Sequence, residues 1–222
     1  MASTFTRDLT DSSADFLRVV WPIIRPWMGG GSILPVEGNV DAHLAQALDR
    51  HAGIDAWHIV PGKGVRGVAS RVQWIEPQRT PWNTFTLRYA RESGTETEFS
   101  KRKKSLAILE DGWVFPSVTV QAYVDYPRGQ GNLRSVAVMN TPDLLQAFDD
   151  ILTVLHENYA NEVIEACIAG NTSQQPIISW HQKAVAGMRH TSGATFVWCH
   201  WDALGQRHPL LGRWDAHASV ST

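Results

Sequence analysis

Cysteine is scarce in this sequence, because only Cys167 and Cys199 occur among 222 residues. They lie far apart without CxxC spacing, which excludes the disulfide framework of small secreted domains. Long uncharged apolar runs are also missing, since arginines and prolines interrupt the stretch FLRVVWPIIRPW near the N-terminus. That stretch is therefore neither a signal-peptide core nor a membrane span. These absences predict a soluble, cytoplasmic protein with reduced thiols.

The charge of the chain is small in total but unevenly placed. The formal net charge is −2, yet residues 61–104 hold ten Lys and Arg against four Glu, a local net of +6. Residues 142–166 carry six acidic residues and no Lys or Arg. The basic segment predicts a nucleic-acid partner, although a solvated basic face balanced by an acidic one fits the same pattern. The candidate backbone-binding cations are Lys63, Arg66, Arg88, Lys101, Arg102, Lys103 and Lys104.

Hydrophobic periodicity predicts a mixed α/β (α+β) fold. Residues 54–60, 67–75 and 83–91 are short, rich in β-branched and aromatic residues, and separated by turn signals, so we expect three consecutive antiparallel strands. Two further strands are expected within 114–126 and 133–141. Helical patterns precede, separate and follow these strands, and the segment 141–163 is the most regular of them. The result is a central mixed sheet of about five strands flanked by helices.

The segments at the two ends differ in composition from the middle. A helix capped by Asp11, Ser12 or Ser13 is expected before a glycine hinge, which makes residues 1–35 a helical extension. Residues 36–170 are expected to form the α/β core. Residues 171–222 form a second extension rich in Trp and His. Tryptophans at the two ends also favour a different class of function, a non-catalytic subunit that binds a protein partner through its extensions.

The order of these elements, with Asp55 in LDRHAGIDAW at a helix–strand junction, resembles the PD-(D/E)XK nuclease core over about residues 37–158. The resemblance implies a restriction-endonuclease-like fold. It also implies a first acid at the start of one strand and an acid-x-lysine pair on the next, converging on Mg²⁺ or Mn²⁺. Asp55 matches the first acid, with Asp49 as the alternative. Glu37 is the expected second carboxylate and, with Asp55, the expected metal ligand.

The acid-x-lysine strand departs from the family pattern. GVASRVQW contains neither an acid nor a lysine, so the two positions fall on Ala69 and Arg71, or on Gln73 and Ile75. We expect Asp55, Gln73 and Arg71 to form the candidate catalytic set, with Arg71 contacting phosphate through its planar guanidinium. The predicted function is metal-dependent phosphodiester cleavage, or binding of nucleic acid by a catalytically degenerate core, with DNA favoured over RNA. The structural alternative is that Asp55 hydrogen-bonds the backbone of the preceding Gly-Ile turn and that Arg71 and Arg88 form surface ion pairs.

Two other groups of residues invite functional interpretations. Glu96-Thr97-Glu98 has the E-x-E form of arginine-directed ADP-ribosyltransferases, but an acidic helix start accounts for it as well. Imidazole and thiolate are zinc ligands, and the tail contains several histidines and one cysteine. Their spacing matches no known finger, so a packed aromatic extension is the competing interpretation. The tail residues concerned are His181, His190, Cys199, His200 and His208.

Overall fold

The computed structural model describes residues 4–36, 53–107 and 115–216, which form two compact units. Unit 1 is assembled from residues 1–83, 114–141 and 210–222. Unit 2 is assembled from residues 84–113 and 142–209. The fold is mixed α+β and contains a central mixed sheet, as predicted, together with a second sheet.

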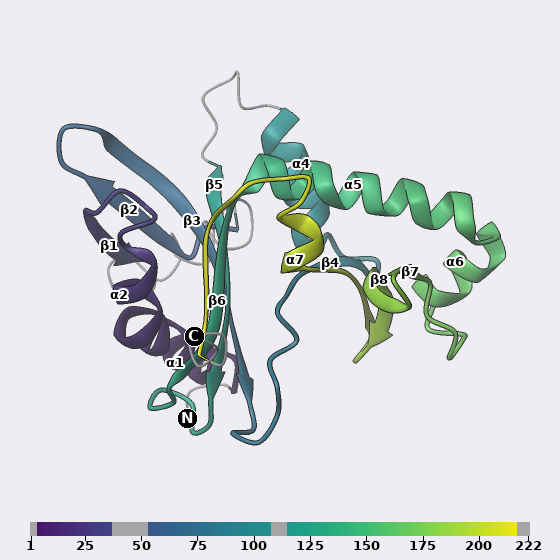
Figure 1. The fold of residues 1–222 in the computed structure, drawn as a ribbon, viewed down its shortest axis with the longest axis horizontal. Helices are drawn as coiled ribbons and strands as arrows, with labels where there is room; N and C mark the ends of the chain where they lie inside the picture. Colours follow the sequence, from purple (N-terminus) through teal and green to yellow (C-terminus); the bar gives the residue numbers. More distant parts are fainter. Residues whose placement is uncertain (1–3, 37–52, 108–114, 217–222) are drawn as a thin grey trace. The chain divides into compact units, whose positions relative to one another are not determined.

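A six-stranded mixed sheet forms the centre of unit 1 (Figure 1). All neighbouring strands are antiparallel except β3 and β5, which run parallel. The order across the sheet is β1 (Ser32–Pro35), β2 (Ala56–Val60), β3 (Gly64–Ile75), β5 (Pro116–Asp125), β6 (Leu133–Asn140) and β10 (Leu210–Asp215). The central strands β5 and β6 are buried along nearly their whole length, which explains their almost continuous apolar sequences.

One face of this sheet is covered by the N-terminal helical segment (Figure 1). The segment runs through α1 (Thr4–Asp15), the π-helix η1 (Phe16–Val20) and α2 (Trp21–Ile24). Phe16, Val20, Ile24 and Met28 pack against alternate residues of the sheet in one apolar cluster. Residues 1–35 therefore contribute a large share of the unit 1 core. The prediction that this helix begins at residues 11–13 is wrong, because α1 already begins at Thr4.

The junction of α1 and η1 is fixed by Asp15, whose side chain is completely buried. Its Oδ1 accepts a hydrogen bond from Arg18 Nη2 at 2.7 Å. Its Oδ2 accepts one from Trp74 Nε1 at 2.9 Å and one from the backbone N–H of Gly129 at 2.8 Å. A buried carboxylate requires such donors. Asp15 thereby ties the helical segment to the end of β3 and to the loop after β5.

Unit 2 contains an antiparallel four-stranded sheet in the order β4 (Thr84–Arg91), β9 (Ala194–His200), β8 (Lys183–Thr191) and β7 (Ile177–Trp180). Its helices are α4 (Glu98–Ala107), α5 (Thr141–Asn158), α6 (Asn161–Ile168) and the short α7 (Trp201–Leu204). The predicted helix over 141–163 is therefore two helices, α5 and α6. Of the helices that the structure describes, none is long and apolar enough to cross a membrane.

The expectation of three consecutive antiparallel strands is only half right. β2 and β3 pair as predicted, but β4 joins the second sheet and pairs with β9, which is more than 100 residues away in the sequence. β3 instead pairs in parallel with β5. The C-terminal tail is part of both sheets. Residues 177–200 supply three of the four strands in the unit 2 sheet, and β10 is the edge strand of the unit 1 sheet beside β6.

Candidate functional site

Asp55 lies directly before β2, where it contacts the neighbouring strand β3. Its Oδ2 accepts a hydrogen bond from the backbone N–H of Ser70 at 2.6 Å. Its own backbone N–H donates to the carbonyl of Val68 at 2.9 Å, and its carbonyl accepts from Val36 at 2.9 Å. The carboxylate therefore serves as an acceptor for β3 at the point where β2 begins. The backbone N–H that it binds belongs to the next strand.

Arg71 and Gln73 lie on β3, facing away from the helix-covered core. Val68 and Val72 belong to the apolar cluster beneath the helices, so the odd-numbered residues Ala69, Arg71 and Gln73 point to the opposite face. Arg71 pairs in register with Gln121 of β5, and Gln73 pairs with Tyr123. Because paired residues on neighbouring strands share a face, Arg71, Gln73 and Gln121 form a polar row across the middle of the sheet.

Gln121 is the most unusual member of this polar row. Its side chain is 1% exposed, and its Nε2 has no hydrogen-bond partner within the described residues. Leaving such a donor unsatisfied costs about 1–3 kcal/mol, and buried polar atoms of this kind call for an explanation. The sequence signal for this residue was an amide inside the otherwise apolar strand VTVQAYV. Gln121 was not among the site residues predicted from the sequence.

One of the two positions predicted for the acid-x-lysine pair lies next to Asp55. Ser70, which binds Asp55, is the central residue of the triplet Ala69-Ser70-Arg71, so this triplet adjoins the predicted first acid. Ala69 is fully buried and carries no ligand atom. Glu37 and Asp49 lie outside the described residues. Among the residues that are described, no group of three or more His, Cys, Asp and Glu is placed to hold a metal ion.

A hard cation such as Mg²⁺ prefers about six oxygen ligands in near-octahedral geometry. Besides Asp55, the described side chains of the candidate set offer only the amide oxygen of Gln73 and the cation Arg71. This donor set does not fit a divalent metal by itself. We therefore derive no catalytic step through a metal from these residues.

No family model, curated protein or solved structure matches this chain.

Two predicted nucleic-acid contacts lie around the β2–β3 hairpin. Lys63 is exposed in the turn. Arg66 is held inside unit 1, because its Nε donates to His58 Nδ1 at 3.0 Å and its Nη2 donates to the carbonyl of Met28 at 3.0 Å. Burial lowers the pKa of Arg66. Its partner His58 is fully buried, with Nε2 2.7 Å from the carbonyl oxygen of Gly30. Arg66 thus stabilises the glycine-rich segment before β1, whereas Lys63 faces solvent.

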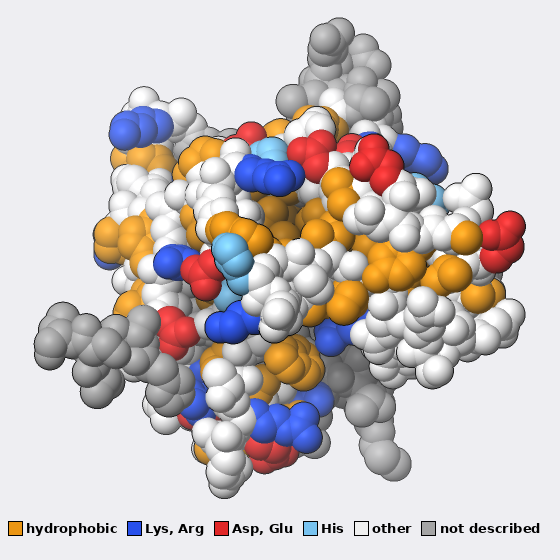
Figure 2. Space-filling model, turned by 45° about the vertical axis from the view of Figure 1, so that its right-hand side comes forward, with side chains coloured by type: hydrophobic (Ala, Val, Ile, Leu, Met, Phe, Trp, Pro, Cys, Tyr) orange, Lys and Arg blue, Asp and Glu red, His pale blue; other side chains and the backbone are white. Residues whose placement is uncertain are grey.

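The other predicted cations belong to unit 2, and several form ion pairs there. Arg88 binds Glu98 at 3.3 Å, Lys103 binds Asp149 at 2.6 Å, and Lys104 binds Glu96 at 2.6 Å. Lys101 is half-buried and Arg102 is only 7% exposed. On the face shown in Figure 2, the described Lys and Arg side chains are scattered among other types instead of forming one continuous basic surface.

The E-x-E segment holds α4 against β4. Glu98 Oε2 accepts from the backbone N–H of Arg88 at 3.2 Å, in addition to its ion pair with the guanidinium. Between the two glutamates, Thr97 is 3% exposed and donates to the carbonyl of Tyr89 at 3.1 Å. These contacts position the start of α4 on the sheet.

The histidines and Cys199 of the tail have separate surroundings. His190 contacts Thr195 and Glu92, whereas His181 stacks on Trp180. His200 is near Asp202, and His208 is near Asp150. Cys199 is buried, which raises the pKa of its thiol to about 12. At neutral pH this thiol is protonated, so it is neither a nucleophile nor a preformed thiolate ligand.

Proposed function

We propose that this protein binds nucleic acid through unit 1, using a nuclease-like sheet that grips the phosphate backbone without cutting it. The observation that carries the proposal is the 2.6 Å hydrogen bond from Ser70 to Asp55. It places the predicted first acid beside the triplet that ends in Arg71. The strand arrangement also supports the proposal, because across the sheet the antiparallel strands β1, β2 and β3 are followed by β5, which runs parallel to β3.

Binding is favoured over cleavage because of what occupies the second acidic position. Ala69 replaces the carboxylate, and Arg71 replaces the lysine. An arginine cannot act as a base at neutral pH, but its planar fork suits bidentate contacts with phosphate oxygens. The pair therefore retains an attraction for phosphate while lacking a second metal ligand. Gln73, half-buried beside Arg71 in the polar row, offers an amide group that hydrogen-bonds sugar or phosphate.

The expected binding is weak and sensitive to salt. Arg71 is the central cation, and the exposed Lys63 adds a second contact at the hairpin. Each neutralised phosphate on duplex DNA contributes a slope of about −0.9 to the plot of log affinity against log salt concentration. Two contacts therefore predict a slope of about −2. The cations of unit 2 add little, because they are dispersed over its surface in separate ion pairs.

Fluorescence anisotropy with short labelled single- and double-stranded DNA and RNA, in the presence of EDTA, tests this proposal. The wild-type chain is titrated at salt concentrations from about 50 mM to 200 mM. The Arg71→Gln variant should bind more weakly and reduce the magnitude of the slope by about 1, whereas Arg71→Lys should retain the slope. Arg25→Gln is the matched control, because Arg25 is an exposed cation of unit 1 at the end of α2.

Cleavage is scored in parallel with Mg²⁺ or Mn²⁺ in place of EDTA. Asp55→Asn is the preferred variant, because an amide oxygen still accepts the Ser70 hydrogen bond and the fold is retained. Binding without cleavage supports the proposal. Cleavage that disappears in Asp55→Asn would show an active metal-dependent nuclease instead. If no nucleic acid binds, or if Arg71→Gln and Arg25→Gln behave alike, the proposed interface is wrong.

A further inference from the structure

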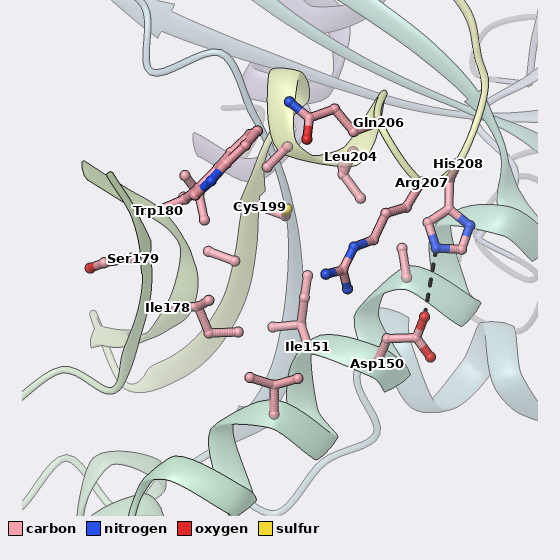
Figure 3. Close-up of a pocket in the computed structure, with 15 residues that line it drawn as sticks. Asp150, Ile151, Ile178, Ser179, Trp180, Cys199, Leu204, Gln206, Arg207 and His208 are labelled. Atoms are coloured by element: carbon pink, nitrogen blue, oxygen red, sulfur yellow. Dashed lines mark ion pairs between the residues drawn. The ribbon is translucent and has the colours of Figure 1, made fainter. Parts of the chain in front are cut away.

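A second potential binding region is a pocket that lies entirely within unit 2. Its volume is about 440 Å³, which is within the usual range for small-molecule sites. One wall comes from successive turns of α5, and the others come from β7, β8, β9 and the segment from α7 to His208 (Figure 3). The apolar lining residues are Ala147, Ile151, Val154, Ile178, Trp180, Val185, Ala186, Cys199, Ala203 and Leu204.

Arg207 supplies a positive charge to the otherwise mainly apolar lining of this pocket. Its guanidinium extends over the apolar floor toward the space between Ile151 and Cys199 (Figure 3). Within the described residues, this guanidinium forms no hydrogen bond or ion pair. Its positive charge also acts on Cys199 inside the pocket. Burial raises the pKa of the Cys199 thiol, and the nearby charge of Arg207 lowers it by a smaller amount. A cation placed over an apolar surface in this way is suited to an anionic partner.

The acidic residue of the pocket does not neutralise Arg207. Asp150 Oδ1 accepts a hydrogen bond from Gln146 Nε2 at 3.0 Å. Its Oδ2 lies 3.6 Å from His208 Nε2 at the edge of the pocket (Figure 3). Both carboxylate oxygens therefore already have partners. One positive charge remains available, which matches a monoanion better than a dianion such as a phosphate monoester.

Trp180 forms a partly exposed boundary of the pocket. Its side chain is 47% exposed, and its ring stacks on His181 with centroids 5.2 Å apart. The adjoining hairpin turn is fixed by positive φ values at His181 and Gln182. A large aromatic surface left partly in water beside an apolar basin is a common feature of ligand sites.

The geometry points to a binding site in unit 2 for a small amphiphilic carboxylate, with its apolar body in the basin and its carboxylate on Arg207. The aliphatic side chains of α5, β7 and β8 remove the body of the ligand from water. The planar guanidinium donates parallel hydrogen bonds to both carboxylate oxygens. This site is independent of the nucleic-acid interface proposed for unit 1.

Isothermal titration calorimetry of the full chain with octanoate, and with octanol as the neutral analogue, tests this assignment. Octanoate should bind the wild type, and octanol should bind at least about tenfold more weakly because it lacks the carboxylate. Arg207→Gln should weaken octanoate binding by about tenfold or more, while Arg207→Lys should lose less. Arg91→Gln is the matched control, an exposed arginine of unit 2 outside the pocket.

Two further variants locate the ligand. Ala203→Trp fills the basin from α7 and should abolish octanoate binding, with folding checked by circular dichroism. Trp180→Phe keeps the wall apolar and should remove most of the change in tryptophan fluorescence that octanoate produces. The assignment is overturned if the wild type does not bind octanoate, if octanol binds equally well, or if Arg207→Gln matches Arg91→Gln.

Discussion

Asp15→Ala should cause the largest loss of stability expected from any single polar residue described above. Asp15 is fully buried and accepts three hydrogen bonds, from Arg18, Trp74 and Gly129. The alanine variant removes all three acceptor interactions. It leaves the indole N–H of Trp74 and the backbone N–H of Gly129 without their partner, and it leaves Arg18 without its counter-ion.

The magnitude follows from these contacts. A hydrogen bond to a charged group contributes about 1.5–3 kcal/mol, and removing one partner of a buried ion pair costs about 3–5 kcal/mol. Arg18 is 43% exposed, so its own share is small because water can replace the lost interaction. The contributions within one network are not additive. We therefore expect Asp15→Ala to lower the free energy of unfolding of unit 1 by about 3–4 kcal/mol.

Urea denaturation followed by tryptophan fluorescence and circular dichroism measures this change. The midpoint should fall without a large change in slope, which would show that stability itself was altered. Asp11→Ala is the matched control, a half-buried acid on the same helix, and should change stability by less than about 0.5 kcal/mol. A loss below about 1 kcal/mol for Asp15→Ala would refute the reasoning that this network anchors the helical segment.

Two further predictions concern a thiol and a pair of glycines. Burial raises the pKa of Cys199 from 9.0 to about 12, so unfolding at alkaline pH releases a proton that the folded state retains. Stability should therefore fall as pH rises above about 9, by up to about 1.4 kcal/mol per pH unit. Cys199→Ala should show a shallower decline in urea denaturation across pH 9 to 10, and identical slopes would contradict the assigned pKa. Gly31 has a φ of +84°, and a Cβ there would overlap the carbonyl oxygen of Ile59, whereas Gly30 has a φ of +80° and open space around it. Gly31→Ala should lower the melting temperature far more than Gly30→Ala, which carries only the cost of about 1–2 kcal/mol for a left-handed conformation. Equal effects would show that the Ile59 contact does not limit this position.

The strands and the long helix of this protein were predictable because their signals are local. The apolar runs around Val120 and Val136 and the helical spacing after Thr141 identify β5, β6 and α5. The distribution of strands between two sheets was not predictable in the same way. β4 has a strand-like pattern that fits either sheet, and its partner β9 lies more than 100 residues away. Pairing over such distances depends on the packing of whole units.

The candidate site was predictable only in part. Asp55 and the triplet ending in Arg71 were identified from the resemblance and adjoin in the structure. Glu37, the expected second ligand, lies outside the described residues. The pocket beside Arg207 was not predicted, because it combines residues from α5, three strands and the segment after β9. The ion pairs of the basic residues were also not predictable from the sequence, because partners such as Lys103 and Asp149 lie on different helices, α4 and α5.

The division of the chain has a consequence for how it folds during synthesis. The chain passes between unit 1 and unit 2 four times, at residues 83/84, 113/114, 141/142 and 209/210. All strands of the unit 2 sheet leave the ribosome before β10, which completes the unit 1 sheet against β6. Until β10 is synthesised, the larger sheet is incomplete and one edge of β6 has no partner strand. Such an edge invites pairing with other chains, so rapid arrival of β10 protects the nascent protein from aggregation.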